Sequence, residues 1–304
     1  MNGFSAGRVM AVGSVNIDRI LRCPVLPSPG ETVLVTSVKE GFGGKGGNQA
    51  VAAATMGAAT HLVAKVGGDA GGLKALANLR GASVGVDTVI TEVSAPTGQA
   101  LVMVDADGRS NIAVIGGANA LLSAQDVTDA LTVLRPLAGD VILTSGEVPL
   151  PCLEAVAGFL APGTRWVHNA TAAGILPAWP EENRPLLVVD ETEARQLTGA
   201  PGARAAARIL AESASGAVVT LGGDGALVAQ EGLCEHITTP AVTVIDTTGA
   251  GDVFCGVLAA ELAHGHPLTR AAATATAAGA FAVTALGARG ALPRPNDLVR
   301  LRAH

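Results

Sequence analysis

Apolar and polar residues along this chain alternate in a way that divides most of it into helices and strands. Segments with helical apolar spacing alternate with short runs that are apolar almost throughout, as in strands buried on both faces. This alternation predicts an α/β fold, a three-layer sandwich in which helices cover a central, mostly parallel sheet. The predicted helices cover residues 48–57, 73–79, 123–134, 150–160, 191–197, 203–211 and 253–263, and the predicted strands cover residues 8–13, 61–66, 140–144, 165–168, 185–189 and 217–221.

Two segments follow a different pattern, in which every second residue is apolar. They are residues 31–38 and 97–104, and the second turns at Asp-Ala-Asp-Gly, residues 105–108, into a further strand at 109–115. Strands with one polar face belong to a sheet that is wet on one side. We therefore expect a small β-sheet lid formed by residues 14–45 and 97–119, and a body formed by residues 1–13, 46–96 and 120–304.

Composition and charge exclude several classes of partner. The 304 residues carry a formal net charge of −6, which argues against a nucleic acid or an anionic membrane surface. The four cysteines are scattered without C-x-x-C spacing, so neither zinc nor a disulfide framework is indicated, and we expect reduced thiols in a cytoplasmic protein. The first residues do not resemble a signal peptide, and no segment reaches the roughly eighteen apolar residues of a membrane span.

The clearest chemical motif is Asp-Thr-Thr-Gly-Ala-Gly-Asp at residues 246–252. It lies between a predicted strand at 242–245 and the predicted helix at 253–263. Free N–H groups at a helix start attract phosphate, and glycines let phosphate approach the backbone. A carboxylate beside such a site is suited to taking a proton from an attacking hydroxyl, and Asp252 has this position. A tight turn with an N-capping aspartate explains the motif equally well.

A second glycine cluster, Gly-Phe-Gly-Gly-Lys-Gly-Gly-Asn at residues 41–48, joins a lid strand to a helix. Gly41, Gly43 and Gly46 formally match the dinucleotide motif, but the preceding strand is the polar-faced one, and no convincing βαβ unit carries an acidic residue at the end of its second strand. The cluster is not a Walker A loop, because Gly46 follows Lys45 where Ser or Thr is required. It suits a loop that contacts a polyhydroxylated ligand, and a turn caused by glycine bias is the alternative.

Polar side chains stand at the ends of several predicted strands, where ligands of parallel sheets bind. Asn16 and Asp18 project from one side of the chain and suit bidentate bonds to sugar hydroxyls, although an Asx turn explains either alone. Glu147 follows another strand, and its alternative is a solvated loop acid. The acidic residues from Asp190 to Glu193 either complement a helix dipole or hold magnesium.

Together these motifs resemble the ribokinase, or phosphofructokinase-B, family of carbohydrate kinases over nearly the whole chain. The resemblance also includes Pro-Ser-Pro-Gly-Glu-Thr at residues 27–32, Gly-Gly-Ala-Asn at 116–119 and Glu-Thr-Glu-Ala at 191–194, in family order and spacing. It implies an α/β body with a β-sheet lid that closes over a sugar and pairs two subunits as a homodimer. It also implies ATP as co-substrate, Mg²⁺, and an activating monovalent cation, often potassium.

The resemblance also implies a role for individual residues. Asp252 would be the general base, beside an anion hole formed by Gly249, Ala250 and Gly251. The sugar pocket would be lined by Asn16, Asp18, Gly44, Lys45, Gly46, Gly47, Asn48 and Glu147. The nucleotide would contact Asp190, Thr220, Leu221, Gly222, Gly223, Asp224, Gly225, Gly251 and Thr276. Glu193 would hold Mg²⁺ through water, and the monovalent-cation loops would include Asp246, Thr248, Ala282, Ala285, Gly287 and Ala291.

Three residues depart from the family pattern. Asp190 replaces a usual Asn, so contact with phosphate there is opposed by charge unless magnesium mediates it. Thr276 replaces an Asn or His near adenine, and Ala291 replaces a Ser of the cation site. The last difference weakens the expectation of potassium dependence more than that of catalysis.

The expected reaction is transfer of the γ-phosphoryl group of ATP to a pentose primary hydroxyl, O5 of D-ribose. The first alternative is another sugar or nucleoside kinase of this fold, acting on fructose, deoxyribose or a deoxy-ketogluconate. A non-catalytic sugar or nucleotide sensor and a nicotinamide-linked oxidoreductase are alternatives of other classes.

Overall fold

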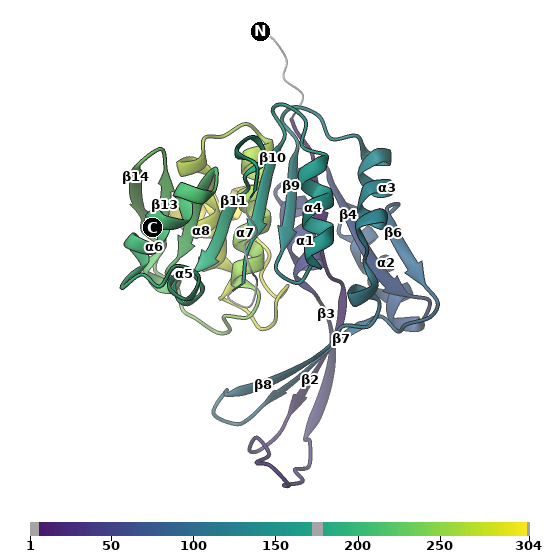
Figure 1. Cartoon of the computed structure of the whole chain (residues 1–304). Helices are drawn as coiled ribbons and strands as arrows, with labels where there is room; N and C mark the ends of the chain where they lie inside the picture. Colours follow the sequence, from purple (N-terminus) through teal and green to yellow (C-terminus); the bar gives the residue numbers. More distant parts are fainter. Residues whose placement is uncertain (1–5, 172–178, 303–304) are drawn as a thin grey trace.

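The protein consists of a layered body and a small sheet that projects from one edge of it (Figure 1). The computed structural model describes residues 6–171 and 179–302. The outermost residues of the expected body segments, 1–5 and 303–304, and the stretch 172–178 lie outside the described residues. None of the helices in the described part of the chain is long and apolar enough to cross a membrane.

A large sheet forms the middle layer of the body, as the alternation of elements predicts. Its order is β14-β13-β12-β11-β10-β9-β1-β4-β5, with β6 paired to β4, and only β13 runs antiparallel to its neighbours, β12 and β14. The strands are β1 Val9–Val12, β4 Thr60–Gly67, β5 Val84–Gly85, β6 Val89–Glu92, β9 Val141–Ser145, β10 Arg165–Asn169, β11 Leu186–Asp190, β12 Gly216–Thr220, β13 Ala226–Gln230 and β14 Leu233–Ile237. Residues of the central strands are almost all buried, which explains their continuous apolar runs.

Helices cover both faces of this sheet. Alternate residues of β1 separate the faces, because Val9 packs among α1, α7 and α8, whereas Met10 packs among α3 and α4. One face carries α1 Lys45–Thr55, α2 Ala70–Gly81, α7 Ala250–Ala263 and α8 Leu268–Ala282, with α9 Pro295–Arg302 packed on α8. The other face carries α3 Ala124–Leu134, α4 Leu150–Gly158, α5 Glu191–Thr198 and α6 Ala203–Ser213. The described residues also include short 3₁₀ turns at Gly117–Leu121, Glu181–Asn183 and Gly222–Asp224.

The projecting sheet has the strand order β3-β2-β7-β8. Its strands are β2 Asn16–Arg22, β3 Ser37–Gly43, β7 Gly98–Val104 and β8 Ser110–Ile115. The predicted hairpin between β7 and β8 is confirmed: Asp105 accepts hydrogen bonds from the N–H groups of Asp107 and Arg109, and Gly108 has a φ of 82°. We call this sheet the lid sheet.

Two of the predicted strands are wrong. Of residues 31–38, only Ser37 and Val38 belong to a strand, because pairing with β2 ends where Arg22 meets Ser37. Leu34 is 85% exposed, so the alternation in this stretch does not reflect a buried face. Residues 242–245 form no ladder either, and the N–H group of Ile245 bonds instead to the carbonyl of Val283 in the loop after α8.

The sequence also failed to indicate the antiparallel hairpin of β13 and β14 at the sheet edge. Its turn uses Glu231 and Gly232, both with positive φ values, of 52° and 78°. Such a turn suits a two-residue hairpin, but the half-exposed β14 has too little apolar periodicity to mark it as a strand.

Helix α7 contacts α1 closely through small residues. An ideal Cβ atom at Gly256 would lie 2.3 Å from the carbonyl oxygen of Gln49 and 2.7 Å from the Cβ of Ala52. Only glycine fits at this position, so the distance between the two helices depends on it.

We expect Gly256→Ala to lower the free energy of unfolding by about 1–3 kcal/mol, because the new methyl group must push α7 away from α1. Urea denaturation measures this change. Gly158→Ala is the matched control, since no atom lies within 4 Å of a Cβ built there and alanine favours the helix. Equal stability of the Gly256 variant and wild type would contradict the close packing of α1 and α7.

Candidate active site

The parallel strands bring the candidate residues to one edge of the sheet. The segments after β1, β9, β10, β11 and β12 all begin at the carboxyl ends of neighbouring strands. Glu147, Asn169, Asp190 and Thr220 lie at or just after four of these ends. The start of the lid sheet lies at the same edge, because β2 begins only three residues after β1.

The predicted anion hole lies at the start of α7. Gly249 is the N-cap residue with a φ of 79°, and an added Cβ would lie 2.6 Å from the Cα of Ala288. The N–H group of Ala250 donates to the carbonyl of Thr247, and the first bond within the helix runs from Val253 N to Gly249 O. The N–H groups of Gly251 and Asp252 precede that bond, so they are the donors best placed for an anion at this end.

Asp252 is only 8% exposed and is held by two side-chain amides of α1. Asn48 Nδ2 donates to one carboxylate oxygen over 2.9 Å, and Gln49 Nε2 donates to the other over 3.2 Å. Burial raises the pKa of Asp252, while the Lys45 ammonium and these two donors oppose the rise. A carboxylate with one donor on each oxygen keeps lone pairs for an incoming hydroxyl.

Lys45, the first residue of α1, and Glu147, which follows β9, are joined by a hydrogen bond. One Glu147 oxygen accepts hydrogen bonds from the hydroxyl of Ser14 and from the backbone N–H of Lys45, the latter over 3.1 Å. Burial alone would lower the pKa of Lys45, but the carboxylates of Asp252 and Glu147 outweigh it and raise the pKa. Lys45 therefore presents a stable positive charge to this site.

Asn16 and Asp18 lie on β2 of the lid sheet and face the same side of it. The Asn16 amide oxygen accepts from Asn119 Nδ2 over 2.8 Å, and Asn119 also bonds both backbone groups of Val15. The Asp18 carboxylate lies over Gly43, where a Cβ would come within 2.1 Å of one oxygen. Its other oxygen, Oδ1, is buried without a hydrogen-bond partner in the described residues. A ligand hydroxyl would satisfy this oxygen.

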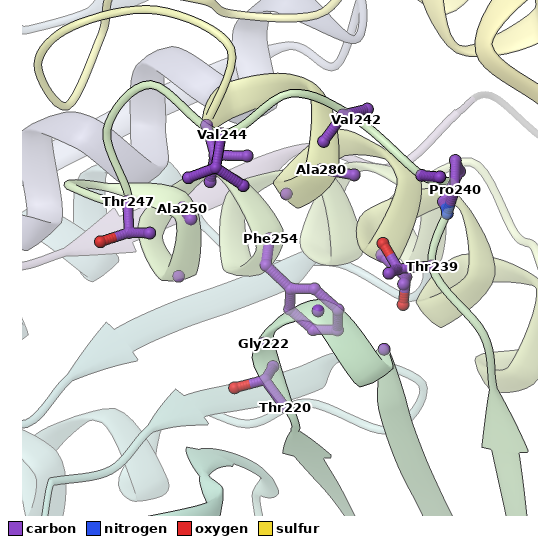
Figure 2. A pocket seen from close by; sticks show the side chains of 17 residues that line it. Thr220, Gly222, Thr239, Pro240, Val242, Val244, Thr247, Ala250, Phe254 and Ala280 are labelled. Carbon is purple, nitrogen blue, oxygen red and sulfur yellow. The ribbon is translucent and has the colours of Figure 1, made fainter.

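Two cavities meet beside the start of α7, and Thr220 and Gly251 line both. The larger has a volume of about 360 Å³ and is mostly apolar. Figure 2 shows Phe254 on α7 between Thr220 and the segment with Val242 and Val244. The size and lining suit a nucleotide base, with the phosphates directed toward the smaller cavity.

The smaller cavity, of about 170 Å³, is polar and adjoins Asp252. Lys45, Asn169, Asp190 and Glu193 contribute to its wall. Asp190 and Glu193 also cap α5 reciprocally: Asp190 Oδ1 accepts from Glu193 N over 2.7 Å, and Glu193 Oε2 accepts from Asp190 N over 2.9 Å. Burial raises the pKa of Glu193. The hydrogen bonds bear out a role at the start of the helix, and the role near a metal stays a prediction.

Oxygen ligands next to a phosphate-sized space fit a hydrated Mg²⁺ bound with a nucleotide. Glu193 Oε2 is engaged in the capping contact, so the pair would hold such an ion through water better than directly. Within residues 6–171 and 179–302, no group of three or more His, Cys, Asp and Glu side chains is arranged to hold a metal ion.

The two predicted monovalent-cation loops contact each other. Asp246 Oδ1 accepts from Thr248 N over 2.9 Å, and Oδ2 accepts from Gly287 N over 2.7 Å. Burial would raise the pKa of Asp246, but these hydrogen bonds outweigh it and hold the pKa low. The carboxylate is therefore charged where the two loops meet, and a monovalent cation beside it stays a prediction.

Comparison with known proteins decides the family. A family model described as pfkB family carbohydrate kinase matches residues 6–295. The chain belongs to this family. A ribokinase of Staphylococcus aureus is 33% identical over 263 residues, covering 84% of this chain and 86% of that protein. A deoxyribokinase of Salmonella typhi is 32% identical over 295 residues, covering 94% and 95%. The structure of Arabidopsis thaliana ribokinase complexed with ribose and ATP superimposes with a TM-score of 0.84 at 28% identity, covering 98% and 99%.

Membership of the pfkB family confirms the predicted enzyme class, a carbohydrate kinase, and the predicted fold class. The glycine cluster at residues 41–48 joins lid strand β3 to α1, so it is not the strand-turn-helix of a dinucleotide-binding unit in the main sheet. The match of Gly41, Gly43 and Gly46 to the dinucleotide motif is therefore coincidental.

Most of the residues that the family resemblance assigns to the nucleotide line one of the two cavities. The larger cavity is lined by Thr220, Gly222, Gly223, Gly225, Gly251 and Thr276, whereas Leu221 and Asp224 line neither cavity. Thr276 donates its hydroxyl to Ala272 O over 2.8 Å, so this hydroxyl is engaged within its own helix. The expected cation-loop residues do not line these cavities either.

Sequence reasoning did not assign several residues that contact this site. Gln49 and Arg289 were not singled out, and Asn119 was noted only as part of a motif. The apolar wall of the larger cavity was also missed, and it includes Pro240, Val242, Val244, Phe254, Ala280 and Val283. Val242 and Val244 lie in the stretch that was expected to be a strand, and Pro240 lies two residues before it.

The pKa of Asp18 is raised mainly by burial, with Glu147 and Asp252 adding to the rise and Arg289 opposing it. Between the ordinary pKa of an aspartate and the raised value, the folded protein therefore holds more of this proton than the unfolded chain does. Its free energy of unfolding should fall as pH rises from about 3.9, the pKa of an unfolded aspartate, through the raised value. We expect Asp18→Asn to gain stability relative to wild type across this range.

Urea denaturation at a series of pH values measures this difference. Asp140→Asn provides a control with the opposite sign, because hydrogen bonds from Arg8 and the backbone hold the pKa of Asp140 below its usual value against burial. The free energy of unfolding of wild type, relative to that of Asp140→Asn, should rise as pH rises toward about 3.9 and change little above it. A difference between wild type and Asp18→Asn that does not change with pH would contradict the raised pKa.

Proposed function

We propose that this carbohydrate kinase transfers the γ-phosphoryl group of ATP to the primary hydroxyl of D-ribose. The proposal rests mainly on the buried Asp252 carboxylate, which lies in the first turn of α7 and lines the smaller cavity together with Lys45. This arrangement combines a base, an anion site and a fixed positive charge at one point. The ribose-bound and ATP-bound structural relative also supports it.

The two cavities divide the nucleotide between them in this proposal. The base occupies the larger, apolar cavity, and the phosphates extend past Thr220 and Gly251 toward Asp252. Mg²⁺ bound with ATP would neutralise part of the phosphate charge, and Asp190 and Glu193 would hold it through water. The Asp190 carboxylate, unusual for the family, then faces a metal rather than bare phosphate.

The proposed reaction needs one proton transfer and one phosphoryl transfer. Asp252 accepts the proton of the primary hydroxyl while the hydroxyl oxygen bonds to the γ-phosphorus, and the bond from that phosphorus to the β,γ-bridging oxygen breaks. The N–H groups of Gly251 and Asp252 and the ammonium of Lys45 stabilise the charge on the transferring group. ADP retains the bridging oxygen as the leaving group.

The sugar would lie between the lid sheet and α1. Asp18 offers a buried oxygen without a partner, and Asn16 has its amide oxygen held by Asn119, which leaves its NH₂ group free to donate. Three carboxylates, those of Asp18, Glu147 and Asp252, face this space. They favour a neutral polyol over a sugar acid, so ribose, deoxyribose or fructose fits this side better than a deoxy-ketogluconate.

We expect Asp252→Asn to lower kcat on the order of a hundredfold to ten-thousandfold, because the general base is lost. Sugar and nucleotide binding should remain near wild type, since Asn is nearly isosteric. A coupled assay of ADP release measures kcat, and calorimetry measures binding. Asp129→Asn, on the exposed face of α3, is the control and should behave like wild type. A kcat within a few-fold of wild type in the Asp252 variant would refute its role.

A panel of D-ribose, 2-deoxy-D-ribose, D-fructose and 2-keto-3-deoxygluconate identifies the acceptor in the same assay. D-Ribose should give the highest kcat/KM. Preferred turnover of another sugar would correct the substrate, and binding of sugar and ATP without turnover would indicate a sensor. The potassium dependence is measured by replacing K⁺ with the larger tetramethylammonium ion, which a carbonyl-lined loop rejects.

We further propose that two lid sheets pair to form a homodimer in the cytoplasm. Cross-strand register places Ile20, Val102 and Ile112 side by side, and Val114 lies on the same face of β8. Ile112 and Val114 are 63% and 66% exposed. An exposed apolar sheet face with open edge strands suits a second copy of itself. All four cysteines lie in the described residues and are free, which supports a reducing compartment.

Ile112→Glu should therefore convert a dimer into a monomer, because it buries a charge at the centre of the paired lids. Sedimentation equilibrium distinguishes the 30.1 kDa chain from its dimer. Val299→Glu on α9 is the matched control, since Val299 is 69% exposed but lies on the body. A monomeric wild type, or a dimer that survives Ile112→Glu, would contradict pairing through this face.

A further inference from the structure

Arg289 brings a guanidinium group from the loop after α8 into the site beside α1. Its Nε donates to Asn48 Oδ1 over 2.7 Å, and its Nη1 donates to Asn78 Oδ1 on α2 over 2.7 Å. An ideal Cβ at Gly47 would lie 2.8 Å from its Nη2. The last glycine of the cluster therefore leaves the space that the guanidinium occupies.

This guanidinium remains charged although it is partly withdrawn from water. Burial lowers the pKa of Arg289 to about 10, and the carboxylates of Asp18 and Asp252 oppose that change. At neutral pH the side chain is therefore a cation that can only donate hydrogen bonds. It belongs neither to the anion hole nor to the predicted cation loops, and the reaction described above does not use it.

Arg289 and Asp252 act on opposite ends of the same side chain. The amide of Asn48 accepts from Arg289 through its oxygen and donates to Asp252 through its nitrogen. A guanidinium only donates and a carboxylate only accepts, so turning the amide over would break both contacts. Asn48 is thus fixed in the one orientation that directs its NH₂ group at the carboxylate.

We infer that Arg289 is a positioning residue for Asp252, acting through Asn48 to hold the carboxylate in the orientation that accepts a hydroxyl proton. The inference rests on the proposed role of Asp252. Gln49 donates to the second carboxylate oxygen but also to Asn169 Oδ1 over 3.2 Å, so its amide is shared. The bond from Asn48 is the shorter of the two, and its direction depends on Arg289.

The anchor on Asn78 explains why arginine suits this position. One guanidinium nitrogen is bound to α2 while another reaches α1, so the planar group bridges two helices from a loop. The loop itself is fixed to Asp246 by the N–H of Gly287. A lysine would keep the charge but could not make both bonds with a fixed direction.

The test is Arg289→Met, which keeps a long side chain and removes the charge and the donors. We expect kcat to fall on the order of tenfold to a hundredfold, because a small misplacement of a reacting group has an effect of this size. Sugar KM should change much less. Arg80→Met, at the exposed end of α2, is the matched control and should leave kcat unchanged.

A pH profile separates positioning from a general loss of structure. The charged and titratable groups around Asp252 are Lys45, Glu147, Asp18, Asp190, Glu193, Cys255 and Arg289. Removing the guanidinium withdraws a positive charge and releases the Asn48 donor, and both changes favour the protonated carboxyl. The acid limb of kcat should therefore move to higher pH in Arg289→Met. A variant that loses kcat and thermal stability but keeps the wild-type acid limb would overturn the inference.

A double variant tests whether Arg289 acts through Asn48. Asn48→Ala combined with Arg289→Met should lose little more kcat than Asn48→Ala alone, because both changes remove the same contact. Losses that multiply would show independent action and overturn the inference.

Wild-type turnover distinguishes this inference from the proposed function. Failure of wild type to phosphorylate any sugar of the panel contradicts the function. In that event NMR still tests whether Arg289 positions Asp252. The chemical shift of the Asp252 carboxyl carbon is followed as a function of pH in wild type and in Arg289→Met. A higher midpoint in the variant supports positioning, and an unchanged midpoint contradicts it.

Discussion

The hydrogen bonds between α1 and the Asp252 carboxylate are the interaction on which the rest of the site depends. A buried carboxylate needs donors on its oxygens, and here neutral amides supply them instead of a direct ion pair. A paired cation would have made the carboxylate a poor base, because it would have lowered its affinity for a proton. The amides reach it only because α7 lies so close to α1, which the absence of a side chain at Gly256 permits.

The sequence was sufficient to predict the secondary-structure elements where burial sets the pattern of apolar residues. The central strands are apolar because both of their faces are covered, and they were placed to within one or two residues. The hairpin of β7 and β8 was also predicted, because Asp105 and Gly108 carry a specific turn signal. Prediction failed where exposure or a ligand cavity sets the pattern, as in residues 31–38, 242–245 and the edge hairpin of β13 and β14.

The candidate site was predictable where a motif is contiguous and less so where contacts join distant segments. Asp252 and the start of α7 are adjacent in sequence, so local rules identify them. Arg289 and Asn48 are 241 residues apart, and Asn119 and Asn16 are 103 apart. One sequence contains no signal for such pairs. An arginine in a loop after a helix is ordinarily expected to be exposed to solvent, so Arg289 did not stand out.

The lining of the larger cavity has a consequence for nucleotide selection. Its lining residues are mainly glycine, threonine, alanine and valine, with Pro240 and Phe254, and the hydroxyl of Thr276 is committed to Ala272. A hydroxyl can both donate and accept, so the threonines of this wall would not tell an amino group from a carbonyl, and the edge of a purine bound there would be distinguished mainly by main-chain groups and solvent. The choice between adenine and guanine donors would then reflect their supply in the cell more than the chemistry of this wall.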